Sequence, residues 1–478
     1  MEQTVILGAG PAGLAAAWRL ARTGHPVTVV EREQAVGGLC RSFELDGCLF
    51  DIGPHLFKPR SEEVAALWDL GCEGDYVRQG TESAPIYFEG ALHHSNSEAI
   101  LAQPWWKIAR MGARFLARTL RPADVLSAED LLRNMRGEEI YQALYRSHEE
   151  KFWGRPLSQI DPSFYVTQTV DLSTSLPSLV AATLRSRFGS SSGAGAVEPK
   201  PEEPTAPLAL ASRFPSRGAG ALYARIRELA EVDGQARFML GTELVAVEHA
   251  EGRVRAVIVR ESGGGEERRI EATNLVSTIP IQVLIASLDP QPETSVATDA
   301  AKLFHRDLVS VNLILAPEPR FPHERIEAFS AAVELFRITH FSGFTPRMAG
   351  RLGHQSVGVE YYCFRDDERW QSSDEELVAL ATRELAAIGL IKERDVIRGK
   401  AIRVKEACPV QIRGHREIRT RLLDHLVGLD KIQSIGRNGL FTYNQMSHSV
   451  DCGLRAAENV LGASHRIDPP GLRESVVF

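Results

Sequence analysis

The stretch Thr4-Val5-Ile6-Leu7-Gly8-Ala9-Gly10-Pro11-Ala12-Gly13 decides the fold of this chain. Its four leading apolar residues predict a short buried strand, and the glycine-rich turn runs directly into an alanine-rich helix from Leu14 to Thr23. A second apolar strand covers residues 26–30 and ends at Glu31. A strand, a helix and a strand at this spacing predict one βαβ unit with parallel strands.

The glycines have the Gly-x-Gly-x-x-Gly spacing of a dinucleotide-binding turn, and this turn follows a strand and opens a helix. Gly8 permits the tight turn, Gly10 lets the backbone approach a pyrophosphate, and Gly13 allows the helix to pack closely on the strand. The helix N-terminus attracts phosphates, and the acid that ends the second strand accepts hydrogen bonds from the adenosine ribose. An empty Rossmann unit is the alternative. The predicted cofactor contacts in this unit are Gly8, Gly10, Ala12, Gly13, Glu31 and Arg32.

Two further segments favour FAD over NAD. Residues 36–42, Val-Gly-Gly-Leu-Cys-Arg-Ser, resemble the segment that flavoproteins of the amine oxidase superfamily lay along FAD. Residues 50–55, Phe-Asp-Ile-Gly-Pro-His, resemble the stretch that next approaches the isoalloxazine ring. The resemblance places Arg41 and Ser42 near the pyrophosphate and the flavin, and a surface charge is the alternative for Arg41. The contacts that the resemblance implies here are Gly38, Leu39, Arg41, Gly53, Pro54 and His55.

The resemblance extends to the C-terminus. Residues 436–439, Gly-Arg-Asn-Gly, follow a predicted strand at 432–435 and precede a predicted helix from about 447 to 461. In this superfamily a glycine and a polar residue hold the ribityl chain here, and the following helix points its positive end at the flavin. Two internal segments also resemble the superfamily. Residues 214–220 are similar to the aromatic, proline and glycine stretch that opens its second FAD segment, and residues 277–280 are similar to the end of the strand that follows. The resemblance adds Val245, beside the adenine, and Gly436, Arg437 and Met446 to the expected contacts.

On these motifs the chain is identified as a member of the FAD-dependent amine oxidase and protoporphyrinogen oxidase superfamily, and its motifs most resemble those of the UDP-galactopyranose mutase-like flavoproteins. Residues 53–57, 151–154 and 436–446 carry this second resemblance. Two positions depart from the mutase pattern. Gln445 stands where the mutases have an aspartate, and His148 stands where they have a tyrosine.

The resemblance implies an α/β fold with a discontinuous Rossmann-type FAD-binding domain, made of residues 1–65, 214–285 and 395–478. A mixed α+β substrate domain is expected from residues 66–213 and 286–394. The Gly/Ser-rich and Pro/Glu-rich stretch from Ser186 to Pro207 predicts a mobile surface loop. The active site is expected between the two domains.

The resemblance further implies an FAD-dependent oxidoreductase, with non-covalent FAD, that moves a hydride from a C–N or C–C bond of an organic substrate to flavin N5. The alternative is a mutase-like isomerase that acts on a nucleotide sugar through reduced FAD. A flavin-bound scaffold is a third class. The expected partner is a small molecule, either free or linked to a sugar, a nucleotide or a lipid.

Three residues are candidates for chemistry. His55 could form a hydrogen bond with the flavin ring or the substrate, or it could accept a proton. The alternative is a structural histidine that is hydrogen-bonded to the backbone. Arg337 lies on a predicted strand among aromatic residues, where a guanidinium suits phosphate or carboxylate, and an interdomain salt bridge is its alternative. Tyr443 could close the pocket beside the ring, and a core tyrosine is equally expected. Trp153 is expected either to stack on a ligand or to pack in the core.

Two smaller expectations concern other polar residues. Lys302 and Lys405 are the candidates for the active-site lysine that many amine oxidases use. Around Glu360, strand alternation predicts that Tyr362 shares its face while Tyr361 points away.

Composition excludes several classes of function. The chain has 478 residues and a formal net charge of -7, which does not favour nucleic acid. Its six scattered cysteines match no zinc template and predict reduced, mostly buried thiols, so no metal site is expected. The N-terminus lacks the features of a signal peptide and no apolar stretch is long enough to span a bilayer, so a cytoplasmic protein is expected.

One segment suggests a second kind of partner. Between Pro104 and Pro122, five basic residues follow one face of a predicted helix that also carries Trp105 and Phe115. A basic amphipathic helix with tryptophans can lie on an anionic membrane surface. The expectation preferred on sequence alone is a helix packed on its domain with a solvated basic face.

Overall fold

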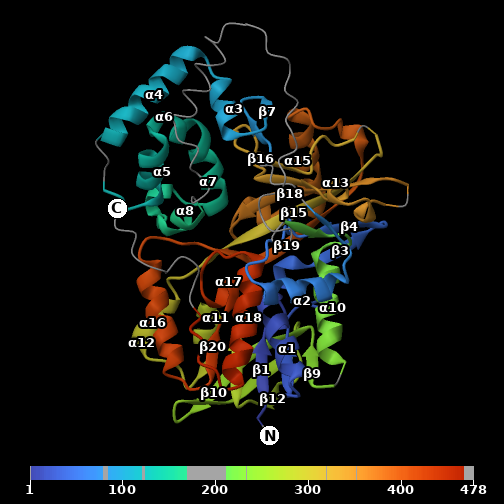
Figure 1. The fold of residues 1–478 in the computed structure, drawn as a ribbon, viewed down its shortest axis with the longest axis vertical. Helices are drawn as coiled ribbons and strands as arrows, with labels where there is room; N and C mark the ends of the chain where they lie inside the picture. The colour runs from blue at the N-terminus through green and yellow to red at the C-terminus, as the bar shows by residue number, and fades with distance from the viewer. Residues whose placement is uncertain are drawn as a thin grey trace.

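The computed structural model describes residues 2–78, 84–120, 124–168, 212–232, 234–318, 320–350 and 352–467. The loop expected at Ser186–Pro207 lies outside them. Figure 1 shows two stacked parts. The lower one, with the N-terminus, is the part expected to bind FAD and is called the FAD-binding part, and the upper one is the part expected to bind substrate and is called the substrate domain.

The FAD-binding part is built on a five-stranded parallel sheet with the order β20-β13-β1-β2-β9. The strands β1 and β2 are paired with Leu7 opposite Val30, so the two ends of the predicted βαβ unit lie side by side. The bounds are β1 Thr4–Leu7, β2 Val27–Val30, β9 Ala236–Met239, β13 Asn274–Ser277 and β20 Ile432–Ser434. This confirms the predicted parallel strands and the predicted α/β class.

The two faces of this sheet are covered by different layers, because alternate strand residues point to opposite sides. Ile6 faces a core formed with the helices α1 (Pro11–Arg22), α2 (Glu62–Cys72), α10 (Ala219–Glu231) and α18 (Met446–Val460). Val5 and Leu7 face a second core, formed with another sheet and the helices α11 (Ile281–Ala286) and α16 (His415–Val427). That sheet has the order β12-β11-β10-β14, with β10 Thr242–Ala250, β11 Arg253–Glu261, β12 Arg268–Glu271 and β14 Leu288–Asp289.

The substrate domain is built on a seven-stranded mixed sheet with the order β19-β15-β18-β17-β16-β6-β7. Its strands are β6 Ile86–Phe88, β7 Ala91–His93, β15 His305–Leu315, β16 Arg325–Ala328, β17 Arg337–His340, β18 Gln355–Cys363 and β19 Val396–Pro409. The helix α15 (Asp374–Ala387) packs against the buried residues of one face. It begins at the predicted capping box, in which Ser373 and Glu376 each bond the other's backbone N–H.

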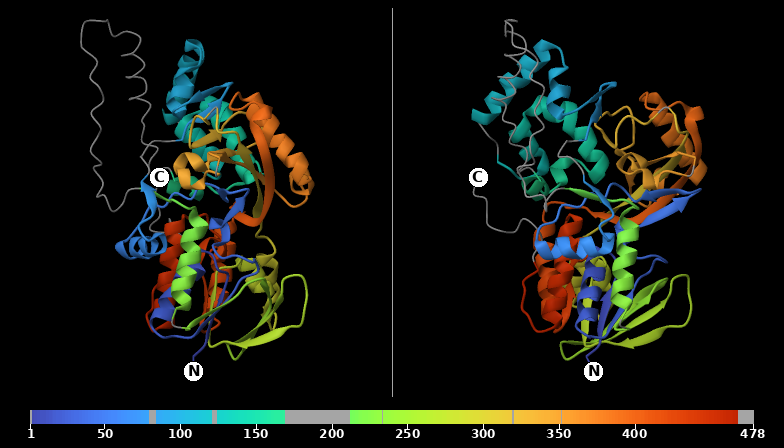
Figure 2. Two further views of the ribbon diagram at one scale, coloured as in Figure 1. Left: turned by 90° about the vertical axis from the view of Figure 1, so that its right-hand side faces the viewer. Right: turned by 45° about the vertical axis from the view of Figure 1, so that its right-hand side comes forward.

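A helical lobe stands beside this sheet (Figure 2). Its helices are α3 Asn96–Leu101, α4 Trp105–Leu120, α5 Ala128–Arg136, α6 Glu138–Ile140, α7 Arg146–Trp153 and α8 Ser163–Gln168, and a π-helical turn at Tyr141–Tyr145 precedes α7. The lobe shares a core with the edge of the sheet through Phe329, Phe336 and Cys408.

Three domain boundaries differ from the prediction. The strand β19 (396–409) pairs along β15 in the substrate sheet, although residues from 395 onward were predicted to belong to the FAD-binding domain. Conversely β14 (288–289) pairs with β10, so the FAD-binding part continues past 285. It also continues past 65, because α2 packs on α10 and β5 (Tyr76–Arg78) pairs with β8 (Arg213–Pro215). Strand partners distant in sequence decide these boundaries, and local periodicity does not reveal them.

All six cysteines are free and buried, as predicted. Among the described residues, no helix combines the length and the apolar character that a bilayer crossing requires.

Candidate cofactor and active site

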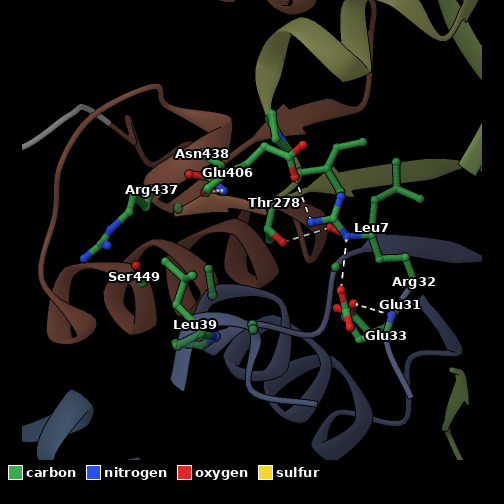
Figure 3. A pocket seen from close by; sticks show the side chains of 18 of the residues that line it. Leu7, Glu31, Arg32, Glu33, Leu39, Thr278, Glu406, Arg437, Asn438 and Ser449 are labelled. Carbon is green, nitrogen blue, oxygen red and sulfur yellow. Dashed lines mark hydrogen bonds and ion pairs between the residues drawn. The ribbon is translucent and has the colours of Figure 1, made fainter. Parts of the chain in front are cut away.

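A cavity of about 350 Å³ lies where β1, β2 and β13 end and where the helices α1 and α18 begin. The carboxyl edge of a parallel sheet is where α/β folds bind their ligands. In Figure 3, Glu31, Arg32 and Glu33 lie at one end of this cavity and Arg437 and Ser449 at the other, with Leu39 between them. The predicted contacts that line it are Gly8, Gly10, Ala12, Glu31, Arg32, Gly38, Leu39, Arg41, His55, Gly436, Arg437 and Met446.

The glycines of the first turn fit their predicted roles. Gly8 has φ +96°, and a Cβ there would lie 2.2 Å from Thr278 Oγ1. A Cβ on Gly13 would lie 2.0 Å from the Gly8 carbonyl oxygen, so Gly13 permits the close contact of α1 with β1 although it does not line the cavity. Gly10 faces Gly38, whose added Cβ would lie 3.1 Å from the Gly10 Cα. The two glycine turns therefore form a narrow cradle that any side chain would fill.

The charged groups at the adenosine end are already oriented. Glu31 Oε2 accepts a hydrogen bond from Ala9 N at 2.7 Å, and Glu31 Oε1 accepts one from Glu33 N at 2.9 Å. Arg32 pairs with Glu406 of β19 at 2.7 Å, and Arg41 pairs with Glu33 at 2.8 Å. The carboxylate at the end of β2 is thus fixed facing the cavity, where a ribose hydroxyl could donate to it.

The opposite wall comes from the C-terminal segment. Gly436 has φ +74°, and its added Cβ would lie 3.2 Å from the Ala12 Cβ, so the C-terminal turn lies against the first helix. Arg437 donates to the Asn444 carbonyl at 2.7 Å, which holds the turn before α18. The helix α18 begins at Met446, beside the cavity, without a side-chain cap.

Some polar groups of the cavity wall are not satisfied by the described part of the chain. Asn444 is 2% exposed, and among the residues that the structure describes its Nδ2 has no hydrogen-bond acceptor. The helix α1 also begins without a side-chain cap. Buried polar groups usually have partners, so these donors point to a bound ligand. Uncapped helix N-termini beside a glycine cradle suit a pyrophosphate, so the residues present fit a dinucleotide such as FAD.

Three predicted contacts other than Gly13 lie outside the cavity wall, namely Gly53, Pro54 and Val245. Val245 lies where the pairing of β10 with β11 shifts register between Leu244 and Ala246, and Thr242, Glu243 and Leu244 line the cavity instead. Ser42 also lies elsewhere, because its Oγ accepts a hydrogen bond from Gly220 N at 2.7 Å at the start of α10.

Sequence reasoning missed the contribution of β19. Val404, Lys405 and Glu406 line the cavity from a strand of the substrate sheet. No local motif marks these residues, since their place depends on the pairing of β19 with β15. Of the two lysines considered, Lys405 lines the cavity, whereas Lys302 pairs with Asp299 at 2.7 Å.

His55 lies beside a fully buried carboxylate. Its Nδ1 is 3.8 Å from Asp51 Oδ2, which is too long for a hydrogen bond, and Asp51 in turn accepts from Ala219 N at 3.0 Å. Burial lowers the pKa of His55, but negative charge on the Cys40 sulfur and on the Asp51 carboxylate outweighs it and raises the pKa to about 10. Nearby negative charge therefore favours the cationic, doubly protonated imidazole at the edge of the cavity.

Gly53 lies two residues before His55, and it brings the loop that carries both residues against the substrate domain. It has φ +82°, and a Cβ there would lie 3.2 Å from Glu360 Oε1 of β18. Glu360 is 2% exposed and forms two bonds with Arg337, from Nε at 2.9 Å and from Nη2 at 2.7 Å. Arg337 and Glu360 are register partners on β17 and β18, so their ion pair lies within one sheet and is not interdomain.

The pair belongs to a charged row across three strands. Glu327 of β16 is the register partner of Arg337 on its other side. Tyr362 lies on the same face as Glu360, and Tyr361 points to the opposite face, where its hydroxyl donates to Glu384 of α15 at 2.9 Å. The predicted alternation is confirmed. The row faces away from α15 and toward the loop that carries His55.

Next to the charged row lies an aromatic wall. It consists of Tyr443 and two side chains of the helical lobe, Phe152 and Phe164. Tyr443 has its ring 5.8 Å from that of Phe152 and 5.3 Å from that of Phe164, and the Arg437 guanidinium lies 4.5 Å over it. Arg437 thus connects the cavity with Tyr443, which does not itself line it. Trp153 is fully buried and donates to Tyr165 Oη at 2.8 Å, which fits its core-packing alternative.

Glu149 accepts a hydrogen bond from Tyr165 at the end of this network. Burial raises the pKa of Glu149 from 4.5 to about 7, against the lowering by Tyr165.

Because the pKa of Glu149 in the folded protein lies above the unfolded value, its contribution to stability is complete below about pH 4.5 and is lost as the pH rises through about 7. Between about pH 5 and pH 8 we expect the free energy of unfolding to fall by about 2 kcal/mol more in the wild type than in Glu149→Gln. Urea unfolding at both pH values measures this, and parallel curves would contradict it.

Comparison with known proteins identifies the family of this chain and several relatives. Residues 11–405 match the family model of the flavin containing amine oxidoreductases. Among curated relatives, the chain is 47% identical over 93 residues to 1-hydroxycarotenoid 3,4-desaturase from Flavobacterium sp. (strain P99-3), which is 19% of each chain. It is 39% identical over 93 residues to putrescine oxidase from Kocuria rosea, covering 19% of this chain and 20% of that protein. These alignments therefore span about a fifth of the relatives' length.

Solved structures resemble the whole chain. A crystal structure of reduced UDP-galactopyranose mutase superposes with a TM-score of 0.79 at 20% identity, covering 98% of this chain and 97% of the other. A putative protoporphyrinogen oxidase from Exiguobacterium sp. 255-15 superposes with a TM-score of 0.69 at 17% identity, covering 96% and 98%. At such identities the likeness concerns the fold, and it agrees with the superfamily predicted from the motifs.

Proposed function

This chain belongs to the flavin containing amine oxidoreductase family, and from that premise we propose that it is an FAD-dependent enzyme that removes a hydride from a C–N or C–C bond of an organic substrate. The observation that carries the proposal is the cavity between the two facing glycine turns, with the Glu31 carboxylate at one end and the uncapped start of α18 at the other. Relatives named as a carotenoid desaturase and a putrescine oxidase support a dehydrogenation.

Membership in the family implies FAD, and the residues described fit it. Glu31 would hold the ribose, the turns at Gly10 and Gly38 would receive the pyrophosphate, and the segment from Gly436 to Met446 would hold the flavin side. When bound, FAD supplies the hydride acceptor. We propose that it is bound without a covalent link, so acid precipitation should release the yellow colour into the supernatant. A yellow pellet would contradict this.

We propose that the reacting end of the site lies where the two domains meet. His55 holds a proton at the edge of the cavity, and its loop reaches Glu360 through Gly53. The charged row of Glu327, Arg337 and Glu360 and the aromatic wall around Tyr443 orient the substrate and exclude water on the side of the substrate domain. His55, Arg337 and Tyr443 are therefore proposed as substrate-facing residues, with His55 the candidate proton donor.

The test is anaerobic reduction of the purified protein by a panel of amines, porphyrinogens, polyenes and polyprenyl-linked sugars. We expect one substrate class to bleach the oxidised flavin band, because the electrons stay on the cofactor when no acceptor is present. Bleaching by an amine or by a polyene would also identify the bond that is oxidised. Failure of every compound to bleach a fully flavin-loaded protein would contradict the proposal.

One observation favours a second candidate, a mutase-like isomerase: the fold matches reduced UDP-galactopyranose mutase over nearly the whole chain. Two positions argue against it. His148 is buried and stacked on Phe329 at 3.9 Å, so it cannot replace a tyrosine that contacts a sugar nucleotide. Gln445 is exposed and cannot ionise. Turnover of a nucleotide sugar only after dithionite reduction, with no net acceptor, would support the isomerase instead.

A further inference from the structure

The helix α4 (Trp105–Leu120) presents an apolar stripe to solvent. Trp105 is 68% exposed, Trp106 51%, Leu116 58% and Leu120 73%. At about 100° per residue, these four side chains and Ala109, Ala113 and Ala117 fall within one sector of about 120°. An exposed sector that contains only apolar residues is unusual on a helix that also has a buried side.

The stripe is not the face with which α4 packs on its domain. Met111 is buried, and Ile108 and Phe115 lie beside it on the half-buried side of the helix. A Cβ added to Gly137 would lie 3.3 Å from Phe115, which locates this packed side against the start of α6. The helix is therefore packed on its domain through this side, as the preferred expectation has it, while Trp105, Trp106, Leu116 and Leu120 stay exposed on another side.

A basic band separates the two sides. It consists of Lys107, Arg110, Arg114 and Arg118, and α4 carries no acidic residue. Arg110 and Arg114 share one carboxylate, Glu139, at 2.9 and 2.5 Å, which leaves an excess of positive charge. Lys107 donates to Gln103 and Arg118 donates to Asn134, both of which are neutral. The band is therefore cationic, although the whole chain has a net charge of -7.

We propose that α4 docks on the surface of an anionic lipid bilayer. The apolar stripe then lies at the boundary between the lipid headgroups and the acyl chains, and the basic band lies at the phosphate groups. Tryptophan suits this boundary because one end of the indole is apolar and the other donates a hydrogen bond. The band complements anionic headgroups, whereas in a two-fold dimer built on this face the bands of the two copies would share one interface and repel each other. Figures 1 and 2 show α4 on the outside of the helical lobe, near the end of the molecule opposite the N-terminus. This inference does not depend on the proposed reaction.

The test is flotation of the full-length, flavin-loaded protein with phosphatidylcholine vesicles that either contain or lack phosphatidylglycerol. We expect binding to the anionic vesicles, a loss of that binding as salt is raised, and about tenfold weaker binding of Leu116→Ser/Leu120→Ser. The matched control is Leu352→Ser/Val427→Ser, which removes two leucine- and valine-sized side chains that are 74% and 78% exposed elsewhere. Its binding should equal that of the wild type, and flavin absorbance checks that each variant is folded.

Two results would overturn the proposal. One is no flotation of the wild type with anionic vesicles, or equal flotation of the α4 variant and its control. The other is a dimer, measured by light scattering, that Leu116→Ser/Leu120→Ser dissociates while vesicles fail to bind, because the stripe would then face a second copy of the chain.

Discussion

Gly10→Val should remove FAD binding and leave the fold intact. Gly10 has φ −76° and ψ −177°, which a β-branched residue adopts without strain, and an added Cβ meets only the Gly38 Cα at 3.9 Å. The valine methyl groups would instead occupy the cradle between the two turns, where the pyrophosphate must approach the backbone. We expect the affinity for FAD to fall by at least about a hundredfold, or about 2.7 kcal/mol, and the free energy of unfolding of the FAD-free protein to change by less than about 1 kcal/mol.

Two other glycines make this result interpretable. Gly112→Val in α4 is the matched control, because a Cβ there meets nothing within 4 Å, and it should bind FAD normally. Gly13→Val should instead destabilise the protein itself, since its Cβ would lie 2.0 Å from the Gly8 carbonyl oxygen. Fluorescence titration of the FAD-free proteins and thermal unfolding separate the two outcomes. An affinity of Gly10→Val within threefold of the wild type would contradict the assignment of the cradle.

Arg337→Met should cost about 3 kcal/mol of the free energy of unfolding, because it leaves the Glu360 carboxylate buried without its partner. Burial opposes the charge of Arg337, but the Glu360 carboxylate raises its pKa well above the ordinary value, so the pair is ionised. The double variant Arg337→Met/Glu360→Leu removes both charges and should recover most of the loss. Urea unfolding followed by circular dichroism measures all three free energies.

The double variant also tests the proposed contact of Arg337 with substrate. If Arg337 and Glu360 only neutralise each other, the folded double variant should keep the wild-type KM for the true substrate. If either side chain also contacts substrate, KM should rise by about tenfold while FAD stays bound. An unchanged KM would therefore remove Arg337 from the substrate-facing residues, and equal stability of the single and double variants would contradict the buried pair.

The FAD-binding half of the site could be predicted from residues 4–55, because its elements are local. A strand, a turn and a helix that are adjacent in sequence must also be adjacent in space, and the steric demands of Gly8 and Gly13 follow from that connection. The C-terminal contacts at Gly436 and Met446 came from resemblance to a family, and the cavity includes them. The capping box at Ser373 was likewise a local signal that the structure bears out.

The contribution of the second domain to the site was decided by tertiary structure alone. The strand β19 reaches the cavity because it pairs with β15, about ninety residues earlier in the chain, and nothing in the sequence near Lys405 announces that pairing. The ion pair of Arg337 with Glu360 depends in the same way on the register of β17 with β18. The outward direction of Trp105 and Leu116 depends on which side of α4 meets Gly137. By itself the sequence determined the cofactor turn, because backbone sterics act between neighbours. Only the assembled sheets decided which distant side chains face the cavity, because strand register is set by the packing of the whole domain.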